Sequence, residues 1–370
     1  MAVHRESNWY RKISPFCRQK QACFSDITAK SLTVRRTLFF VLLASLYLGS
    51  LPTFAQIGGK KSFEFLNVPS HGRLAGLGGV NVSHRDRDLN FFLSNPALAG
   101  DTLAGIGSAS YMFYVADVGE ATFSYAHRFK KIGMLSFGVQ HLGYGNIKSY
   151  DAAGIELSEF KSSETALVIG KSHLVSAFRL GLNLKMVFSN IAGYRASAVL
   201  FDLGGCFIHP KKDLTIGLAI KNVGFVLSDY TSTGGASLPF DVQLGTTFKP
   251  EHMPIRFSLT AYNLSKDNVA YYDASSGTEE PGALDKVLRR FNFGSEILIH
   301  QKFNVLLGYN YFVHQELKLE EAGGGAGITF GFSLRIKSFD FVFSRNGYVV
   351  GNAGYGFTLS KNIESMIKRK

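Results

Sequence analysis

Large apolar side chains occupy every second position of residues 178–188, FRLGLNLKMVF, and polar or small residues fill most positions between them. This period of two predicts a β-strand and not a helix. The run is about twice the usual strand length of about 5–6 residues, and it suits the roughly 9–11 residues that a tilted strand needs to cross a bilayer. A soluble sandwich would place Arg179 and Lys185 in water, whereas a membrane barrel would point them into a polar lumen.

The same alternation recurs along the rest of the chain and predicts fourteen strands. The expected strands are 103–116, 119–129, 132–142, 162–173, 175–189, 194–208, 213–223, 239–249, 254–264, 289–300, 303–313, 325–337, 339–346 and 351–360. An even number is what bacterial single-chain barrels have.

The joints between these strands alternate in length. With the N-terminus on the periplasmic side, one rim receives only short turns, such as Lys130-Lys131 and His173-Leu174. The other rim receives all the long connections, which are 143–161, 224–238, 265–288 and 314–324. This sorting is typical of transmembrane barrels, and a soluble sandwich gives no reason for it. The sequence therefore predicts an all-β fold, a 14-stranded antiparallel transmembrane β-barrel. Lys and Arg should face its lumen, because each would cost about 2–4 kcal/mol in mid-bilayer lipid.

A targeting segment precedes the barrel. Arg35-Arg36 is followed by the apolar run from Thr37 to Leu51 and by small residues that end at Ala55. This pattern predicts a secretory signal peptide cut after Ala55; the alternative is an N-terminal membrane anchor. We expect export to the bacterial outer membrane. The predicted organisation is a leader with an N-terminal extension (1–55), a hatch or plug segment (56–102), the barrel (103–360) and a basic tail (361–370).

Composition and charge remove several classes of function. The 370-residue chain has 39 Gly and 32 Phe but only 9 Pro, which suits long strands with tight turns. Its net charge of +12 falls to +6 without residues 1–55, and no dense block of Lys and Arg suggests nucleic acid. Cys17 and Cys23 lie in the leader, so Cys206 stands alone, without a disulfide framework or a cysteine-based metal site.

Residues 56–102 differ from the rest of the chain because they are rich in Gly and lack long alternation. A short helix is expected from Ser70 to Leu77, ended by Gly78-Gly79, and Asn95-Pro96-Ala97 is expected to form a turn and a short helical piece. With about 45 residues and little core, this segment should not fold alone. We expect it to plug the barrel.

The stretch FLNVPSHGRLAGLGGVNVSHRDRDLNFFLSNPALAG, followed by fourteen strand signals, resembles the FadL-like outer-membrane barrels. It is most similar to the PorQ branch of the type IX secretion system of Bacteroidota, with PorV as a near relative. The resemblance covers about residues 62–360 and implies a fourteen-stranded barrel with an N-terminal hatch. It also implies a non-catalytic part in a cell-surface attachment complex with PorU, PorV and PorZ.

Few residues carry recognisable chemistry. Ser158 and Lys161 match the S-x-x-K motif, but no K-T-G follows and the match is interpreted as chance. The histidines show no metal-ligand spacing. The sequence thus predicts no enzyme, cofactor or metal. Charged residues on the polar faces are expected to form ion pairs in the lumen: Glu120, Arg128, Arg179, Lys185, Lys221, Asp241, Arg256 and Glu296.

Two functions remain as hypotheses. The first is a barrel in outer-membrane lipid that anchors surface secretion proteins of the PorZ, PorU and PorV type through its outward loops. Tyrosine is frequent in partner contacts, and the loops carry Tyr150, Tyr230, Tyr271 and Tyr272. The alternative is a FadL-type channel for hydrophobic small molecules, which the polar lumen positions disfavour. Whether a small molecule binds stays open.

Overall fold

The computed structural model describes residues 62–231, 237–266, 269, 281–317, 325–349 and 352–364. The chain divides into two units, Met1–Gln56 and Ile57–Lys370, and the described residues all belong to the second. The predicted signal peptide lies outside the described residues, as does most of the predicted tail. No helix in the described part of the chain has the length and apolarity needed to cross a membrane.

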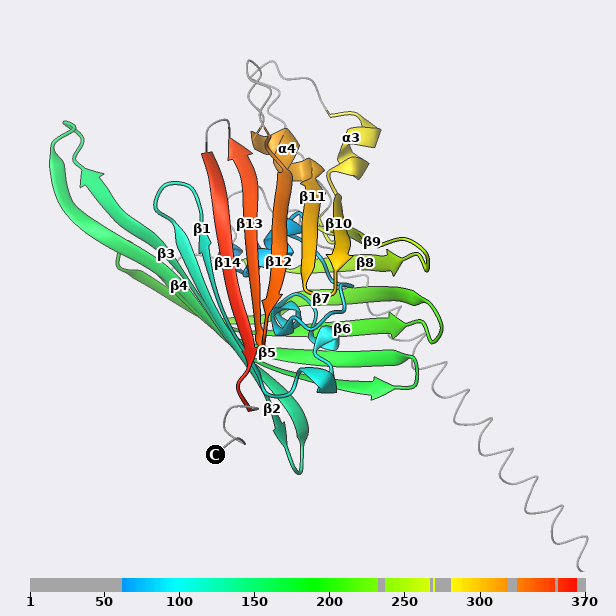
Figure 1. The fold of residues 1–370 in the computed structure, drawn as a ribbon. Helices are drawn as coiled ribbons and strands as arrows, with labels where there is room; N and C mark the ends of the chain where they lie inside the picture. Colours follow the sequence, from blue (N-terminus) through cyan, green and yellow to red (C-terminus); the bar gives the residue numbers. More distant parts are fainter. Residues whose placement is uncertain are drawn as a thin grey trace, which may run out of the picture. The chain divides into compact units, whose positions relative to one another are not determined.

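Fourteen strands form one closed antiparallel barrel (Figure 1), as the alternation predicts. Each strand pairs with its neighbours in sequence, and β1 closes the ring by pairing with β14 along eight residue pairs. The strands are β1 (Ile106–Phe113), β2 (Gly119–Phe129), β3 (Gly133–Tyr150), β4 (Glu156–Val175), β5 (Phe178–Ile191), β6 (Tyr194–Ile208), β7 (Asp213–Ser228), β8 (Asp241–Lys249), β9 (Ile255–Ala261), β10 (Phe291–His300), β11 (Phe303–Asn310), β12 (Ile328–Ile336), β13 (Phe339–Val349) and β14 (Asn352–Asn362).

The two faces of β5 are sorted as the sequence predicts. Leu180 on the outer face is 58% exposed, whereas Lys185 on the inner face is only 2% exposed. Asn183 is also fully buried and donates a hydrogen bond to the backbone of Phe92 inside the ring. An apolar exterior around a polar interior is the arrangement of outer-membrane barrels.

One of the predicted short turns is misplaced. Leu174 and Val175 continue β4 by pairing with Arg179 and Phe178, so the turn consists of Ser176 and Ala177 and not of His173-Leu174. Ser176 has a φ of 57°, the left-handed conformation that a two-residue hairpin turn requires.

The predicted loop 143–161 is mostly a β-hairpin. Beyond Gly143, where pairing with β2 stops, β3 continues to pair with β4 until Tyr150 lies opposite Glu156. On the other side, β4 pairs with β5 only from Ser163 onward. The hairpin 144–161 therefore extends past its neighbours with both edges unpaired (Figure 1). Its alternation is weak because both of its faces meet solvent.

The other long connections also contain regular structure. In 224–238 the first residues continue β7 as far as Ser228, 265–288 contains α3 (Ala283–Leu288), and α4 (Tyr311–Leu317) begins directly after β11. Both helices lie at the same end of the ring as the tip of the β3–β4 hairpin (Figure 1).

Residues 62–104 form the hatch, which lies within the ring of strands (Figure 1). Its elements are η1 (Glu64–Asn67), α2 (Gly72–Gly76), η2 (Leu89–Leu93), η3 (Pro96–Leu98) and η4 (Asp101–Leu103). Phe65 and Phe92 are buried with the inward side chains of Leu142, Val187 and Leu200 from the wall. The segment has no core of its own, and the barrel supplies one.

Candidate functional site

The Asn95-Pro96-Ala97 motif is seated in a recess of the barrel wall. Asn95 caps η3 by accepting a 2.9 Å hydrogen bond from the Ala97 nitrogen, and Pro96 takes the first helical position, where its missing N–H costs nothing. Gly181 of β5 and Gly204 of β6 lie directly opposite each other in the wall. A Cβ atom on either glycine would overlap the motif, so only glycine allows this close approach.

Two more cross-strand glycine pairs receive the backbone of the hatch. Gly217 of β7 faces Gly245 of β8, and a Cβ on Gly217 would overlap the carbonyl of Val82. Gly294 of β10 faces Gly308 of β11, and a Cβ on Gly308 would overlap the hatch backbone at residues 77–78. The hatch therefore touches backbone to backbone in three places around the ring.

Wall asparagines bind the carbonyl groups that these close approaches leave without partners. Asn292 donates to the Leu77 carbonyl at 2.9 Å and to the Val80 carbonyl at 2.7 Å, and Asn310 donates to Gly78 at 3.1 Å. Gly78 adopts a φ of 92°, which a side chain would strain. The predicted hatch glycines thus end α2 and turn the chain so that its carbonyls meet the wall.

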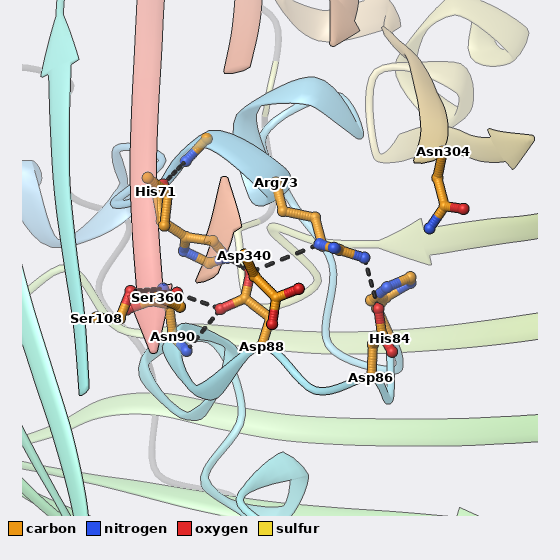
Figure 2. Close-up of polar contacts among 12 residues, drawn as sticks. His71, Arg73, His84, Asp86, Asp88, Asn90, Ser108, Asn304, Asp340 and Ser360 are labelled. Carbon is orange, nitrogen blue, oxygen red and sulfur yellow. Dashed lines mark hydrogen bonds and ion pairs between the residues drawn. The ribbon is translucent and has the colours of Figure 1, made fainter. Parts of the chain in front are cut away.

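Arg73 ties the hatch to the wall electrostatically. Its guanidinium lies 2.6 Å from Asp86 and 3.6 Å from Asp88 within the hatch (Figure 2). It also lies 2.9 Å from Glu296 of β10 in the wall. Glu296 is 1% exposed and also accepts a 2.7 Å hydrogen bond from Arg256 of β9. Buried charges need such partners, because an unpaired charge inside a protein is strongly unfavourable. We call Arg73, Asp86, Asp88, Arg256 and Glu296 the hatch clamp.

The buried, charged surroundings of the clamp shift the pKa values of several hatch residues. Burial alone would lower the pKa of Arg73, but the surrounding carboxylates, led by Glu296, raise it above its usual value. Burial would raise the pKa of Asp86, yet Arg73 and its other charged neighbours hold it well below its usual range. Burial lowers the pKa of His71 and of His84 to about 4, so both rings are neutral at neutral pH.

His84, Asp86 and Glu296 also place ligand-type atoms within 4.8 Å of one another. The two carboxylates are already bound by the guanidinium groups of Arg73 and Arg256. A divalent cation would have to displace these groups, so the arrangement favours a structural clamp over a metal centre.

The predicted lumen ion pairs are found in part. Arg256 and Glu296 do bind each other, and Lys185 lies 2.7 Å from Asp202, an aspartate that the sequence reasoning left out. Arg128 contacts Asp101 at 3.4 Å, but the pair is exposed at the end of β2 and not enclosed in the lumen.

Glu120, Arg179 and Asp241 take part in none of the ion pairs among the described residues, so for them the prediction of lumen ion pairs is wrong. Glu120 accepts hydrogen bonds from neutral groups, such as the Gln140 amide at 3.2 Å. Asp241 accepts from the Gln243 amide at 2.7 Å. Arg179 is buried beside the hatch backbone at Gly100. Charge alternation in sequence gives the face of a residue but not its partner across the barrel.

The candidate tyrosines separate into three cases. Tyr150 is exposed near the tip of the β3–β4 hairpin, where a partner can reach it. Tyr230 is not a free loop residue, because its hydroxyl donates to Ser189 at 2.6 Å and its ring stacks on Phe63 of the hatch. Tyr271 and Tyr272 lie outside the described residues.

A cavity of about 250 Å³ lies between the hatch and the wall. The hatch supplies its floor with Gly78, Gly79 and Val80, and β8, β11, β12 and β13 supply walls. Tyr262, which follows β9, lines it as well and donates a 2.8 Å hydrogen bond to Asn310. Sequence reasoning missed this cavity, although Asn and Gly at inward strand positions, where they are poor strand formers, are the signal for it.

No family model and no curated protein matches the chain. Several solved structures are similar in fold. The TodX monoaromatic hydrocarbon channel deltaS2 mutant is 13% identical over 80% of this chain and 98% of its own, with a TM-score of 0.48. The CymD monoaromatic hydrocarbon channel is 10% identical over 81% and 97%, with a TM-score of 0.46. A FadL homologue of Pseudomonas aeruginosa is 10% identical over 80% and 98%, with a TM-score of 0.43.

At these values the similarity concerns the barrel fold alone, which the strand pairing of this chain already establishes. TodX and CymD are described as monoaromatic hydrocarbon channels, and the third structure is described as a FadL homologue. Nothing in the comparisons bears on the PorQ branch or on type IX secretion, so both stay predictions, as does the absence of enzymatic activity.

Proposed function

We propose that the protein is an outer-membrane channel for small molecules whose lumen is gated by the hatch. The observation that carries this proposal is a polar-lined barrel closed by a segment that no disulfide holds, since Cys206 is a free cysteine. On the side of β7 to β12 the hatch contacts the wall mainly through hydrogen bonds, ion pairs and close packing at glycine, whereas apolar packing holds it on the side of β2 to β6. Water can replace such polar contacts at a modest net cost of about 0.5–1.5 kcal/mol for each hydrogen bond.

A narrower part of the proposal is which class of small molecule passes through the channel. The solved channels of similar fold are described as channels for monoaromatic hydrocarbons, which makes small apolar rings one candidate class. The inner faces of the strands here are polar, as with Asn183 and Lys185. Polar permeants are therefore the second class to test.

A disulfide that locks the hatch tests the proposal. The Ser83 hydroxyl of the hatch lies 2.8 Å from the Thr247 hydroxyl of β8. A Ser83→Cys/Thr247→Cys variant, made with Cys206→Ala, should cross-link hatch and wall on oxidation. We expect liposomes that contain the reduced protein to take up glucose, or cells that express it to take up toluene across their lipopolysaccharide layer, and oxidation to block this uptake.

The matched control is Ser108→Cys/Ser360→Cys, which joins two wall strands at hydroxyls 2.8 Å apart. Its oxidation should leave uptake unchanged, because the cross-link joins β1 to β14 and not the hatch. The hydrogen bond from Asn90 of the hatch to the Ser108 hydroxyl is absent from the reduced and the oxidised variant alike. The proposal of a hatch-gated channel is rejected if uptake is the same for the reduced and the oxidised Ser83→Cys/Thr247→Cys variant. It is also rejected if the reduced protein shows no uptake.

A second candidate function is surface attachment, and the projecting hairpin 144–161 favours it. Its unpaired edges and the exposed Tyr150 offer a surface outside the membrane-crossing part of the barrel. Partners of the PorU, PorV and PorZ type are an expectation from the resemblance only. Deletion of residues 147–159 in a host with type IX secretion should release secreted cargo from the cell surface if this role is real, and it should leave liposome uptake intact.

A further inference from the structure

We infer that the cavity between the hatch and β8, β11, β12 and β13 is a binding site for a small neutral saccharide. The cavity adjoins the hatch, so a saccharide bound there would lie on the path of a molecule that passes through the proposed channel. In that role the site rests on the proposed function. At about 250 Å³ the cavity lies just below the usual range of ligand pockets, about 300–1,000 Å³. It therefore suits one or two sugar rings and not a long chain.

Two residues that line this cavity each carry a buried acceptor atom without a hydrogen-bond partner. These atoms are Oδ1 of Asp241, a residue only 3% exposed, and Oδ1 of Asn346, a residue only 4% exposed. Buried polar groups are nearly always satisfied, so each such atom requires an explanation. Because both atoms are acceptors, the group that satisfies them must donate a hydrogen bond.

The remaining lining narrows the class of ligand. The Gln243 amide adds an acceptor oxygen and a second donor hydrogen, whereas the Asn310 amide is already bound to Gly78 and Tyr262. Tyr262 and Tyr348 add aromatic surface. A hydroxyl group can donate and accept at once, so a ring with several hydroxyls can satisfy both carboxylate and amide oxygens. Its C–H faces can meanwhile cover the tyrosine rings.

Other ligands fit this lining less well. An apolar ring such as toluene would leave Oδ1 of Asp241 and of Asn346 without a donor, and such unmet groups are costly. An anion would approach the carboxylates of Glu64 and Asp241, which also line the cavity. A cation would find the charge of Asp241 already opposed by Lys221, which lies directly opposite it in the pairing of β7 with β8. A neutral molecule rich in hydroxyl groups needs no charged partner.

Binding can be measured on the full-length protein in detergent by saturation-transfer NMR, with glucose, galactose and N-acetylglucosamine as probes at millimolar concentration. Toluene and lysine serve as apolar and cationic comparisons. We expect at least one sugar to bind. Asn346→Leu should weaken this binding about tenfold or more, because one hydrogen bond to the ligand is lost and an apolar group replaces it.

Asn190→Leu is the matched control. Asn190 on β5 also carries a buried Oδ1 without a partner, but it does not line this cavity. Sugar binding should therefore survive this change. Each variant is checked for folding by the heat-modifiable gel shift that folded barrels show. If Asn346→Leu fails to fold, Asp241→Asn provides a second test, because asparagine keeps the side-chain volume of aspartate.

The binding experiment tests the saccharide site independently of the proposed channel. Sugar binding that Asn346→Leu abolishes and Asn190→Leu preserves supports the site, even if liposomes take up no sugar and the channel proposal fails. The inference is overturned if no sugar binds, if toluene or lysine binds in preference, or if both Leu variants behave alike.

Discussion

Replacement of Glu296 by Gln should release the part of the hatch that contains α2. Glu296 accepts from Arg73 at 2.9 Å, from Arg256 at 2.7 Å and from Asn304 at 3.1 Å. The removal of one partner from a buried ion pair typically costs about 3–5 kcal/mol. Glutamine keeps the volume and one acceptor oxygen, and Arg73 keeps Asp86 at 2.6 Å. We therefore expect a loss near the lower end, about 3 kcal/mol.

Hydrogen exchange of the hatch measures this loss directly. The amides of Ala75, Leu77 and Gly79 are bonded within the hatch, to the carbonyls of His71, Arg73 and Leu74. Their exchange reports local opening, whose free energy can lie well below that of global unfolding. Since about 1.4 kcal/mol corresponds to a factor of ten, Glu296→Gln should speed the exchange of residues 72–79 roughly 100-fold.

The control is Glu164→Gln on β4, which also removes a buried inward carboxylate. Glu164 accepts a 2.6 Å hydrogen bond from Tyr144 of the neighbouring strand and makes no ion pair with the hatch among the described residues. Its replacement should leave the exchange of residues 72–79 within a few-fold of the wild type. If Glu296→Gln leaves the hatch protected, or if both variants expose it equally, the clamp does not hold the hatch in the way that these contacts imply.

Three further predictions concern the recess, the interior charges and pH. Gly181→Val should displace η3 from the wall, because even a Cβ overlaps residues 96–97; hydrogen exchange of residues 95–99 should rise, and an unchanged rate would contradict the recess. Lys185→Met should lose about 3–5 kcal/mol in urea unfolding, while Lys185→Met/Asp202→Leu should recover most of it; a double variant as unstable as the single one would count against the pair. His71 and His84 have folded-state pKa values of about 4, below the ordinary 6.5, so on acidification the undocked hatch takes up protons before the docked hatch does. The free energy that protects the hatch from opening should therefore fall as the pH is lowered from about 6.5 to about 4, by up to about 3 kcal/mol for each ring. NMR titration of both rings near pH 6.5 would refute this.

The strands of the wall were predictable from sequence, and the reason is physical. Each inward or outward position of β5 is decided by one local question, whether that side chain prefers lipid or a polar interior. The answer for Leu180 or Lys185 depends on no other residue. All fourteen strands follow from this rule. It fails where both faces meet water, as in the hairpin 144–161, and it does not fix the strand ends, as at Val175 and Tyr311.

The contacts between hatch and wall could not be predicted in the same way. Arg73 and Glu296 are 223 residues apart in sequence, and only the closure of the ring brings them together. The alternation of apolar and polar residues predicted that Glu296 points inward. It could not predict whether its partner is Arg256 or a hatch residue, and Glu296 in fact binds both. A usable signal was present in the wall glycines: Gly204 and Gly308 interrupt strands at inward positions, where only a close backbone neighbour gives glycine an advantage.

The two sides of the hatch are held by different forces, and this difference indicates where a gate would open. Residues 63–66 and 89–93 pack against inward apolar side chains of β2 to β6, including Leu142 and Leu200. Exposure of that surface to water costs about 25 cal/mol for each Å². Residues 73–83 instead meet β7 to β12 through glycine contacts, amide hydrogen bonds and the clamp, all of which water can partly replace. Their apolar contacts come from Leu74 and Leu77, which form a smaller cluster with Leu306 and Val342 of the wall. The polar side should therefore loosen first, and it is this side that borders the cavity at Gly78 and Val80. A ligand that fills the cavity would contact the part of the hatch that is easiest to move.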